Sequence, residues 1–326
     1  MLTLQKFRST INRKNRRLIS FYPLFIPIIW MAFSNPVYGM RLTAVKHLFD
    51  LTYNFNFPSD VAVSSDGKIY VVDGVNSAIK VFNQSGEYLF SFGREGSRDG
   101  EFRLPLGVGI DSSNKVYIAD SGNHRIQIFN PGGGYLSKIN LPSRKGKPAD
   151  PTDVAVDDSR NRCYIVDNDN HYILVYDLLT LELLATYGSQ GTDKLNFRYP
   201  FLIDLDKDKY LYVVDVINTR IQVLNPEGLF VSFIGGWGVE KGKFFRPKGI
   251  AIDKENRVYV SDSYMGVVQV FKTNGELLSA VGDSVNGKAK KFNTPVGLFV
   301  DDQNRLYVVE MAAQKVSVFH IGNDAE

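Results

Sequence analysis

Residues 105–129 read PLGVGIDSSNKVYIADSGNHRIQIF, and this stretch decides the fold. It holds three short runs rich in Val, Ile and Tyr, at 105–110, 115–119 and 125–129. The runs are separated by Asp, Ser, Asn and Gly, which favour tight turns, whereas β-branched and aromatic residues favour strands. The stretch therefore predicts three successive antiparallel strands.

The same pattern recurs about every 47 residues, which is a period typical of propeller blades. Each repeat unit opens with a proline, at Pro58, Pro105, Pro151, Pro200, Pro247 and Pro295. An acidic residue ends the second apolar run of each unit, at Asp73, Asp120, Asp167, Asp215, Asp262 and Glu310. In the first unit a fourth run follows at 88–92, so one unit contains about four strands, as a blade does.

The two ends of the repeat region indicate how the blades are arranged. The sixth unit ends its third run at 316–319 and lacks a fourth, while the apolar segment 44–51 precedes the first unit and has no place in it. A sheet that is apolar on both faces must stack against neighbours, and its exposed edges must be covered. We therefore predict an all-β, six-bladed β-propeller at residues 44–322, closed by segment 44–51 as the outer strand of the last blade.

The stretch 105–129 closely resembles the NHL repeat. This resemblance implies a six-bladed propeller. Similar proteins include amidating lyases of peptide maturation, sensor domains of bacterial membrane kinases and RNA-binding domains of cytoplasmic regulators. The resemblance therefore implies a fold without selecting one function.

Residues 1–39 have the composition of an export signal. A basic stretch from Lys6 to Arg17 is followed by the apolar run 18–33 and then by Val37 and Gly39, which are small enough to flank a cleavage site. The segment is therefore either a signal peptide cleaved after Gly39 or an uncleaved anchor that crosses the membrane with residues 18–33. In both cases we expect the body to be exported to the cell envelope, the periplasm or the outside, and to meet the membrane only through this segment.

The charge balance argues against nucleic acid as a partner. The chain has 38 Lys and Arg against 35 Asp and Glu. Six of the basic residues lie in positions 1–39, which contain no acidic residue, so the body has 32 basic and 35 acidic side chains. A nearly neutral body lacks the electrostatic field that holds a polyanion.

The chain has a single cysteine, Cys163, so it cannot form an internal disulfide. The apolar residues around Cys163 in the sequence predict that it is a buried hydrophobic side chain.

Three carboxylates are candidate ligand-binding residues of the central channel. Asp60 and Asp153 occupy the second position after the opening proline, and Asp204 lies two positions further along in its own unit. Because the first strand of a blade lines the axis, these side chains are expected near the channel. Together they could bind a hard cation such as calcium, and the alternative is a water-filled channel.

The loops after the repeated acidic residues supply the other candidate ligand-binding residues, Asn123, Asn170, Asn218, His124 and His171. The acidic residues are expected to accept hydrogen bonds from backbone N–H groups of the following turn, with the asparagines tying neighbouring loops. The two histidines occupy equivalent positions and could share a zinc ion, although a catalytic zinc site needs three protein ligands. We therefore interpret them as surface histidines and predict no bound metal.

The long, charged, glycine-rich loops 94–103, 143–150, 189–198 and 236–246 favour recognition on a rigid scaffold. Trp237, Phe245 and Tyr199 are the aromatic residues expected to contact a partner there.

The body contains no nucleophile elbow, phosphate-binding loop or Cys–His pair. We therefore predict a binding module for a protein, peptide or glycan. The alternative is a metal-dependent lyase or lactonase with its site at the channel mouth.

Overall fold

The computed structural model describes residues 41–283 and 288–322, so the predicted signal peptide or anchor at 1–39 lies outside the described residues. The described part is almost entirely β. Its helical elements are three short 3₁₀ turns, at Ser121–Asn123, Asp158–Arg160 and Met311–Ala313. Within these residues no helix has the length and apolar character needed to cross a bilayer.

Each of the first four units forms its own four-stranded antiparallel sheet. The first sheet contains β2 (Pro58–Val63), β3 (Ile69–Asp73), β4 (Ala78–Phe82) and β5 (Tyr88–Phe92). The second contains β6 (Pro105–Ile110), β7 (Val116–Asp120), β8 (Arg125–Phe129) and β9 (Tyr135–Asn140). The third contains β10 (Pro151–Asp157), β11 (Arg162–Asp167), β12 (Tyr172–Asp177) and β13 (Leu183–Tyr187). The fourth contains β16 (Pro200–Leu205), β17 (Leu211–Asp215), β18 (Arg220–Leu224) and β19 (Phe230–Gly235).

The fifth and sixth units are joined in one nine-stranded sheet, which differs from the expected separate blades. The fifth unit contributes β20 (Pro247–Ile252), β21 (Arg257–Asp262), β22 (Val267–Lys272) and β23 (Leu277–Asp283). The sixth contributes β25 (Pro295–Val300), β26 (Arg305–Glu310) and β27 (Lys315–Ile321). The short β24 (Lys288–Ala289) pairs with β23, and β14 (Ser189–Gln190) pairs with β15 (Asn196–Phe197) before the fourth unit.

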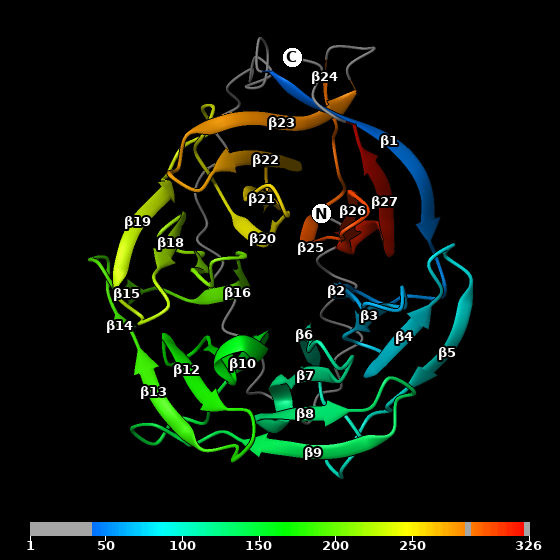
Figure 1. The fold of residues 1–326 in the computed structure, drawn as a ribbon, viewed down its shortest axis with the longest axis vertical. Helices are drawn as coiled ribbons and strands as arrows, with labels where there is room; N and C mark the ends of the chain where they lie inside the picture. The colour runs from blue at the N-terminus through cyan, green and yellow to red at the C-terminus, as the bar shows by residue number, and fades with distance from the viewer. Residues whose placement is uncertain (1–40, 284–287, 323–326) are drawn as a thin grey trace, which may run out of the picture. The chain divides into compact units, whose positions relative to one another are not determined.

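The strand that joins the two units is β1 (Leu42–Leu51), drawn in blue at the outer edge of Figure 1. Its second half pairs antiparallel with β27, from Val45 opposite Ile321 to Leu51 opposite Val316, which confirms the pairing predicted from the sequence. Its first three residues pair in parallel with β23, beginning with Leu42 opposite Ala280. The second pairing was not predicted, and it arises because β1 is long enough to contact two strands in succession.

A polar cluster fixes β1 against the sixth unit. Asp50 Oδ2 accepts a hydrogen bond from the Lys315 ammonium (2.8 Å), and its Oδ1 accepts one from the Ser317 hydroxyl (2.8 Å) and lies 2.9 Å from His47 Nε2. Burial alone would raise the pKa of Asp50, but these hydrogen bonds lower it to about 2. The carboxylate therefore remains ionised and holds strands that are far apart in the sequence.

The inner strands contact one another in the order β2, β6, β10, β16, β20 and β25, and β25 also contacts β2 (Figure 1). Apolar clusters fill the spaces between adjacent units. In one of them, Val61 and Ile69 of the first unit pack with Val309 and Val316 of the sixth. Both faces of each sheet are thus buried against neighbours, which is a β-propeller arrangement.

The second strand of every unit carries a buried tyrosine, namely Tyr70, Tyr117, Tyr164, Tyr212, Tyr259 and Tyr307. Buried tyrosine hydroxyl groups usually find partners, and four of these donate to an aspartate six positions earlier; Tyr117 donates to Asp111 and Tyr212 donates to Asp206, at 3.1 and 3.0 Å. Cys163 is also buried, as predicted, and burial raises the pKa of its thiol. The core is therefore built from one side-chain pattern repeated in each unit.

Candidate functional site

The repeated acidic residues connect two kinds of loop. Asp120 accepts a hydrogen bond from the backbone N–H of Arg103 (2.8 Å), and Asp215 accepts one from Arg198 (2.7 Å). The other four acidic residues accept the equivalent bond from a backbone N–H. The N–H of Asn56 donates to Asp73, that of Asp150 to Asp167, that of Phe245 to Asp262 and that of Asn293 to Glu310. The loops that precede the inner strands and the loops that follow the second strands therefore lie on one side, which we call the loop side.

The sequence interpretation of these acidic residues was incomplete. Each acidic residue accepts a hydrogen bond from the backbone N–H of the residue 17 positions earlier, in the loop before the inner strand. The following turn supplies an asparagine side chain in four units. The predicted backbone bonds from that turn occur at Asp262, from Tyr264 and Met265, and at Asp167, from Asn170. The difference arises because strand pairing brings the two loops together, a proximity that spacing alone does not show.

The candidate asparagines lie in three different units and are hydrogen-bonded within them. The amide groups of Asn123, Asn170 and Asn218 donate to the acidic residue three positions earlier. They also donate to the backbone carbonyls of Gly96 (2.9 Å), Pro148 (3.2 Å) and Gly191 (2.9 Å), respectively. Each asparagine thus holds a long loop of the loop side in place.

His124 and His171 occupy the same left-handed backbone position, with φ of 58° and 63°. His124 Nδ1 lies 2.6 Å from the carbonyl oxygen of Ala149, whereas His171 Nδ1 accepts a hydrogen bond from the backbone N–H of Tyr199 (3.1 Å). Burial lowers the pKa of His171, which suits this acceptor role. Each histidine therefore contacts the loop that leads into the next unit.

The three channel carboxylates bridge neighbouring inner strands. Asp60 accepts a hydrogen bond from the N–H of Val108 (3.0 Å). Asp153 accepts one from Ile203 and Asp204 accepts one from Ile252, each at 2.8 Å. In every case the donor belongs to the next unit along the chain, so these side chains connect adjacent units.

Burial is the main cause of the raised pKa values of all three carboxylates. The negative charges of Asp153 and Asp204 add to it at Asp60, that of Asp204 adds to it at Asp153, and that of Asp206 adds to it at Asp204. The pKa of Asp60 lies well above its ordinary value, and those of Asp153 and Asp204 are about 7. Between residues 41 and 283 and between 288 and 322, neither these carboxylates nor the two histidines come together with others as a group of three metal-ligating side chains.

The raised pKa values predict that stability depends on pH. A folded-state pKa above the unfolded value contributes stability at low pH, which is lost as the pH rises through the folded pKa. We therefore expect Tm to fall between pH 5 and pH 8, by about 2–4 °C for each kcal/mol lost. Thermal unfolding of wild type and Asp153→Asn over this range measures the effect, and the variant should show the shallower decline. An equally steep decline in both proteins would contradict the assignment to this group.

Glycines occupy the second position after the proline where a neighbouring unit approaches closely. A Cβ on Gly107 would lie 2.5 Å from Asp153 Oδ1, and one on Gly297 would lie 2.5 Å from Asp60 Oδ1. A Cβ on Gly249 would overlap the carbonyl oxygen of Val296. These glycines therefore allow adjacent inner strands to pack against each other.

Exposed aromatic side chains lie on the loop side in the fourth and fifth units. Trp237, in the loop between them, is 76% exposed. Tyr264 is 60% exposed and stacks on Phe245, with ring centroids 4.1 Å apart. Tyr199 differs, because it is partly buried and packs edge-on against His171. Sequence reasoning missed Tyr264, since only the fold brings it against Phe245.

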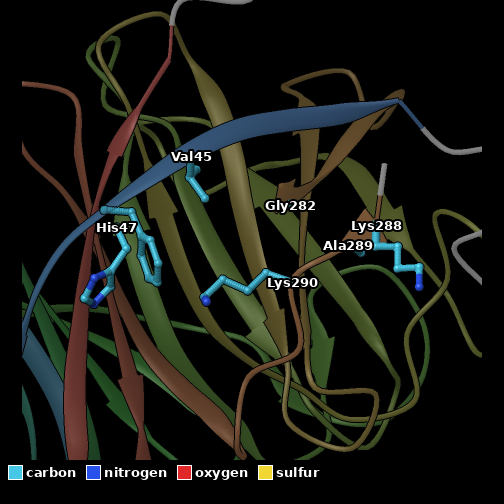
Figure 2. A pocket seen from close by; sticks show the side chains of 7 residues that line it. Val45, His47, Gly282, Lys288, Ala289 and Lys290 are labelled. Atoms are coloured by element: carbon cyan, nitrogen blue, oxygen red, sulfur yellow. The ribbon is translucent and has the colours of Figure 1, made fainter. Parts of the chain in front are cut away.

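A pocket of the described structure lies beside the outer strand β1 (Figure 2). Val45 and His47 of β1 and Phe319 of β27 line it, together with Lys288, Ala289 and Lys290. The Lys290 ammonium lies 5.0 Å from the centroid of the Phe319 ring. The pocket is a product of the joined sheet, because β1 supplies one wall.

The NHL-repeat family model matches residues 55–82, 102–129 and 244–271, which lie in the first, second and fifth units. No curated protein matches the chain. Among solved structures, a streptogramin B lyase is 14% identical, with a TM-score of 0.60, and the match covers 84% of this chain and 97% of the lyase. A Bacteroides thetaiotaomicron protein of unknown function is 16% identical, with a TM-score of 0.63, and the match covers 86% of this chain and 73% of that protein.

A catalytically inactive virginiamycin B lyase from Staphylococcus aureus, solved with quinupristin, is 13% identical and has a TM-score of 0.60. That match covers 83% of this chain and 82% of the lyase. At such identities the likeness concerns the fold alone. The three repeat matches and the sheet arrangement agree: the chain contains NHL repeats in its first, second and fifth units and has a β-propeller fold.

Proposed function

We propose that this chain is an exported, six-bladed NHL-repeat propeller whose loop side binds a protein, peptide or glycan at the cell envelope. In this proposal the nine-stranded sheet counts as two blades joined through β1, and the ring is closed. Two observations support closure: β25 contacts β2, and Gly297 of the sixth unit leaves room for Asp60 of the first. Export is inferred from the composition of residues 1–39.

The observation that carries the binding proposal is a set of aromatic side chains on the loop side: Trp237 and Tyr264 are exposed, and Phe245 stacks on Tyr264. Large aromatic side chains exposed on ordered loops are typical of recognition surfaces. The polar residues around them are engaged elsewhere, since the repeated carboxylates and asparagines hold the loops by hydrogen bonds. The loops thus form a fixed scaffold that presents the aromatic rings to a partner.

Binding to immobilised peptide and glycan arrays tests the proposal with purified full-length chain. We expect Trp237→Ala and Tyr264→Ala each to weaken binding by about tenfold or more, because an aromatic hot spot contributes about 2 kcal/mol. Leu229→Ala is the matched control, since Leu229 is 61% exposed but lies in the loop between β18 and β19, on the opposite side. Equal binding by all four proteins would contradict the proposal.

The alternative function is a metal-dependent lyase or lactonase at the channel mouth. The structural likeness to streptogramin B lyase is the observation that favours testing it. Turnover of a cyclic ester substrate that requires added calcium or zinc, together with no array binding, would favour this alternative over the binding module.

A further inference from the structure

A single lysine lies among the residues that follow the opening prolines. Lys248 is the first residue after Pro247 on the inner strand β20. The equivalent residues of the other units are uncharged, namely Ser59, Leu106, Thr152, Phe201 and Val296. We call these six residues the mouth ring. The mouth ring therefore contains one cation, three large apolar side chains and no carboxylate.

The ammonium group of Lys248 lies on an aromatic ring without a polar partner. Its Nζ is 3.8 Å from the centroid of the Phe201 ring, and in the described part of the chain it makes no hydrogen bond or ion pair. The two hydroxyl groups of the mouth ring are already committed. Ser59 donates to the carbonyl of Leu106 and Thr152 donates to that of Phe201, both at 2.7 Å.

Lys80 shows how this fold satisfies a buried lysine in another place. Its Nζ donates to the carbonyl oxygens of Tyr53 and Asn54, each at 2.6 Å, and lies 2.6 Å from Asp73 Oδ2. Lys248 has no such set. Burial, with a smaller contribution from the positive charge of Arg246, lowers the pKa of Lys248 to about 8. A partly buried ammonium on an aromatic face still has unused N–H donors, and an anion would use them.

We propose that Lys248 is an anion-binding residue that receives the C-terminal carboxylate of a peptide at the mouth ring. This inference rests on the proposed binding function and names the ligand's recognised group. Phe201 and Val296, on the two inner strands that contact β20, provide contacts for an apolar last side chain. They offer no partners for the hydroxyl groups of a uronic sugar, which carries the same carboxylate. Terminal carboxylates are a recurrent recognition element in peptide-binding domains.

The test compares short synthetic peptides that end in Leu or Phe, with either a free carboxylate or a C-terminal amide, by calorimetry on the full-length chain. We expect wild type to bind the free acid at least about tenfold more tightly than the amide, and Lys248→Met to lose this preference. Lys254→Met is the control, because Lys254 is exposed in the loop between β20 and β21. Equal affinity for acid and amide in wild type would overturn the proposal.

A second experiment measures the pKa of the Lys248 amine by NMR. Reductive ¹³C-methylation labels the lysines, and the Lys248 signal is identified as the one missing in Lys248→Met. We expect its pKa, about 8 in the free protein, to rise when the peptide acid is added and to remain unchanged with the amide. An equal rise with glucuronic acid would overturn the assignment to peptides. If Trp237→Ala still abolishes array binding while Lys248 responds to neither acid, the loop-side function stands and this inference fails.

Discussion

Gly249→Ala is expected to lower the free energy of unfolding by about 3 kcal/mol or more, the upper end for an overpacked core position. The Cβ of alanine would overlap the carbonyl oxygen of Val296 in the adjacent inner strand. That strand cannot retreat freely, because Ser261 holds the same carbonyl with a hydrogen bond of 2.8 Å and also accepts one from the N–H of Gly249 (2.7 Å). The substitution would push apart the inner strands β20 and β25.

Chemical denaturation of the purified chain measures this effect, with Gly132→Ala as the matched control. A Cβ on Gly132 would meet only the side-chain oxygen of Asn130, at 3.4 Å, in an exposed turn of the second unit. The control should therefore stay within about 0.5 kcal/mol of wild type. If both variants unfolded at the same denaturant concentration, the close approach between β20 and β25 would be wrong.

Asp120→Asn is expected to cost about 3–5 kcal/mol, as the loss of one partner of a buried ion pair usually does. The Oδ2 atom of Asp120 lies 2.8 Å from Nε of Arg125, and both side chains are buried. The same oxygen accepts a hydrogen bond from Gln127 (3.0 Å) and another from Asn123 (2.9 Å). The asparagine amide cannot neutralise the Arg125 guanidinium, and the N–H groups of that amide would face other hydrogen-bond donors.

The equivalent substitution in the third unit provides an internal control. Asp167 is as buried as Asp120, and it accepts hydrogen bonds from the backbone N–H of Asp150 and from the Asn170 side chain. The residue opposite it on the next strand is Tyr172, whereas the equivalent residue of the second unit is Arg125. Burial raises the pKa of Asp167, so a neutral side chain there removes a charge that the site disfavours. Asp167→Asn should cost about 1–2 kcal/mol, the range for one hydrogen bond. Equal losses in the two variants would show that Arg125 does not depend on Asp120.

The repeat made most of the fold predictable. Proline spacing, short apolar runs and turn residues identified the strands, and the mismatch between the two chain ends predicted the pairing of β1 with β27. These features are local, or follow from counting copies, so no three-dimensional information was needed. The parallel pairing of β1 with β23 could not be predicted in this way, because nothing in residues 42–44 distinguishes it from a free strand end.

The candidate site depended far more on the tertiary structure. The sequence by itself determined that Asp60, Asp153 and Asp204 lie on inner strands, and that His124 and His171 are equivalent. Only the packing of adjacent units decided that these side chains contact the backbone of the next unit. The same packing stacks Tyr264 on Phe245 and places the Lys248 ammonium on the Phe201 ring. A repeat encodes each unit through its own local pattern, whereas burial and charge at the channel arise between units, where residues about 50 positions apart meet.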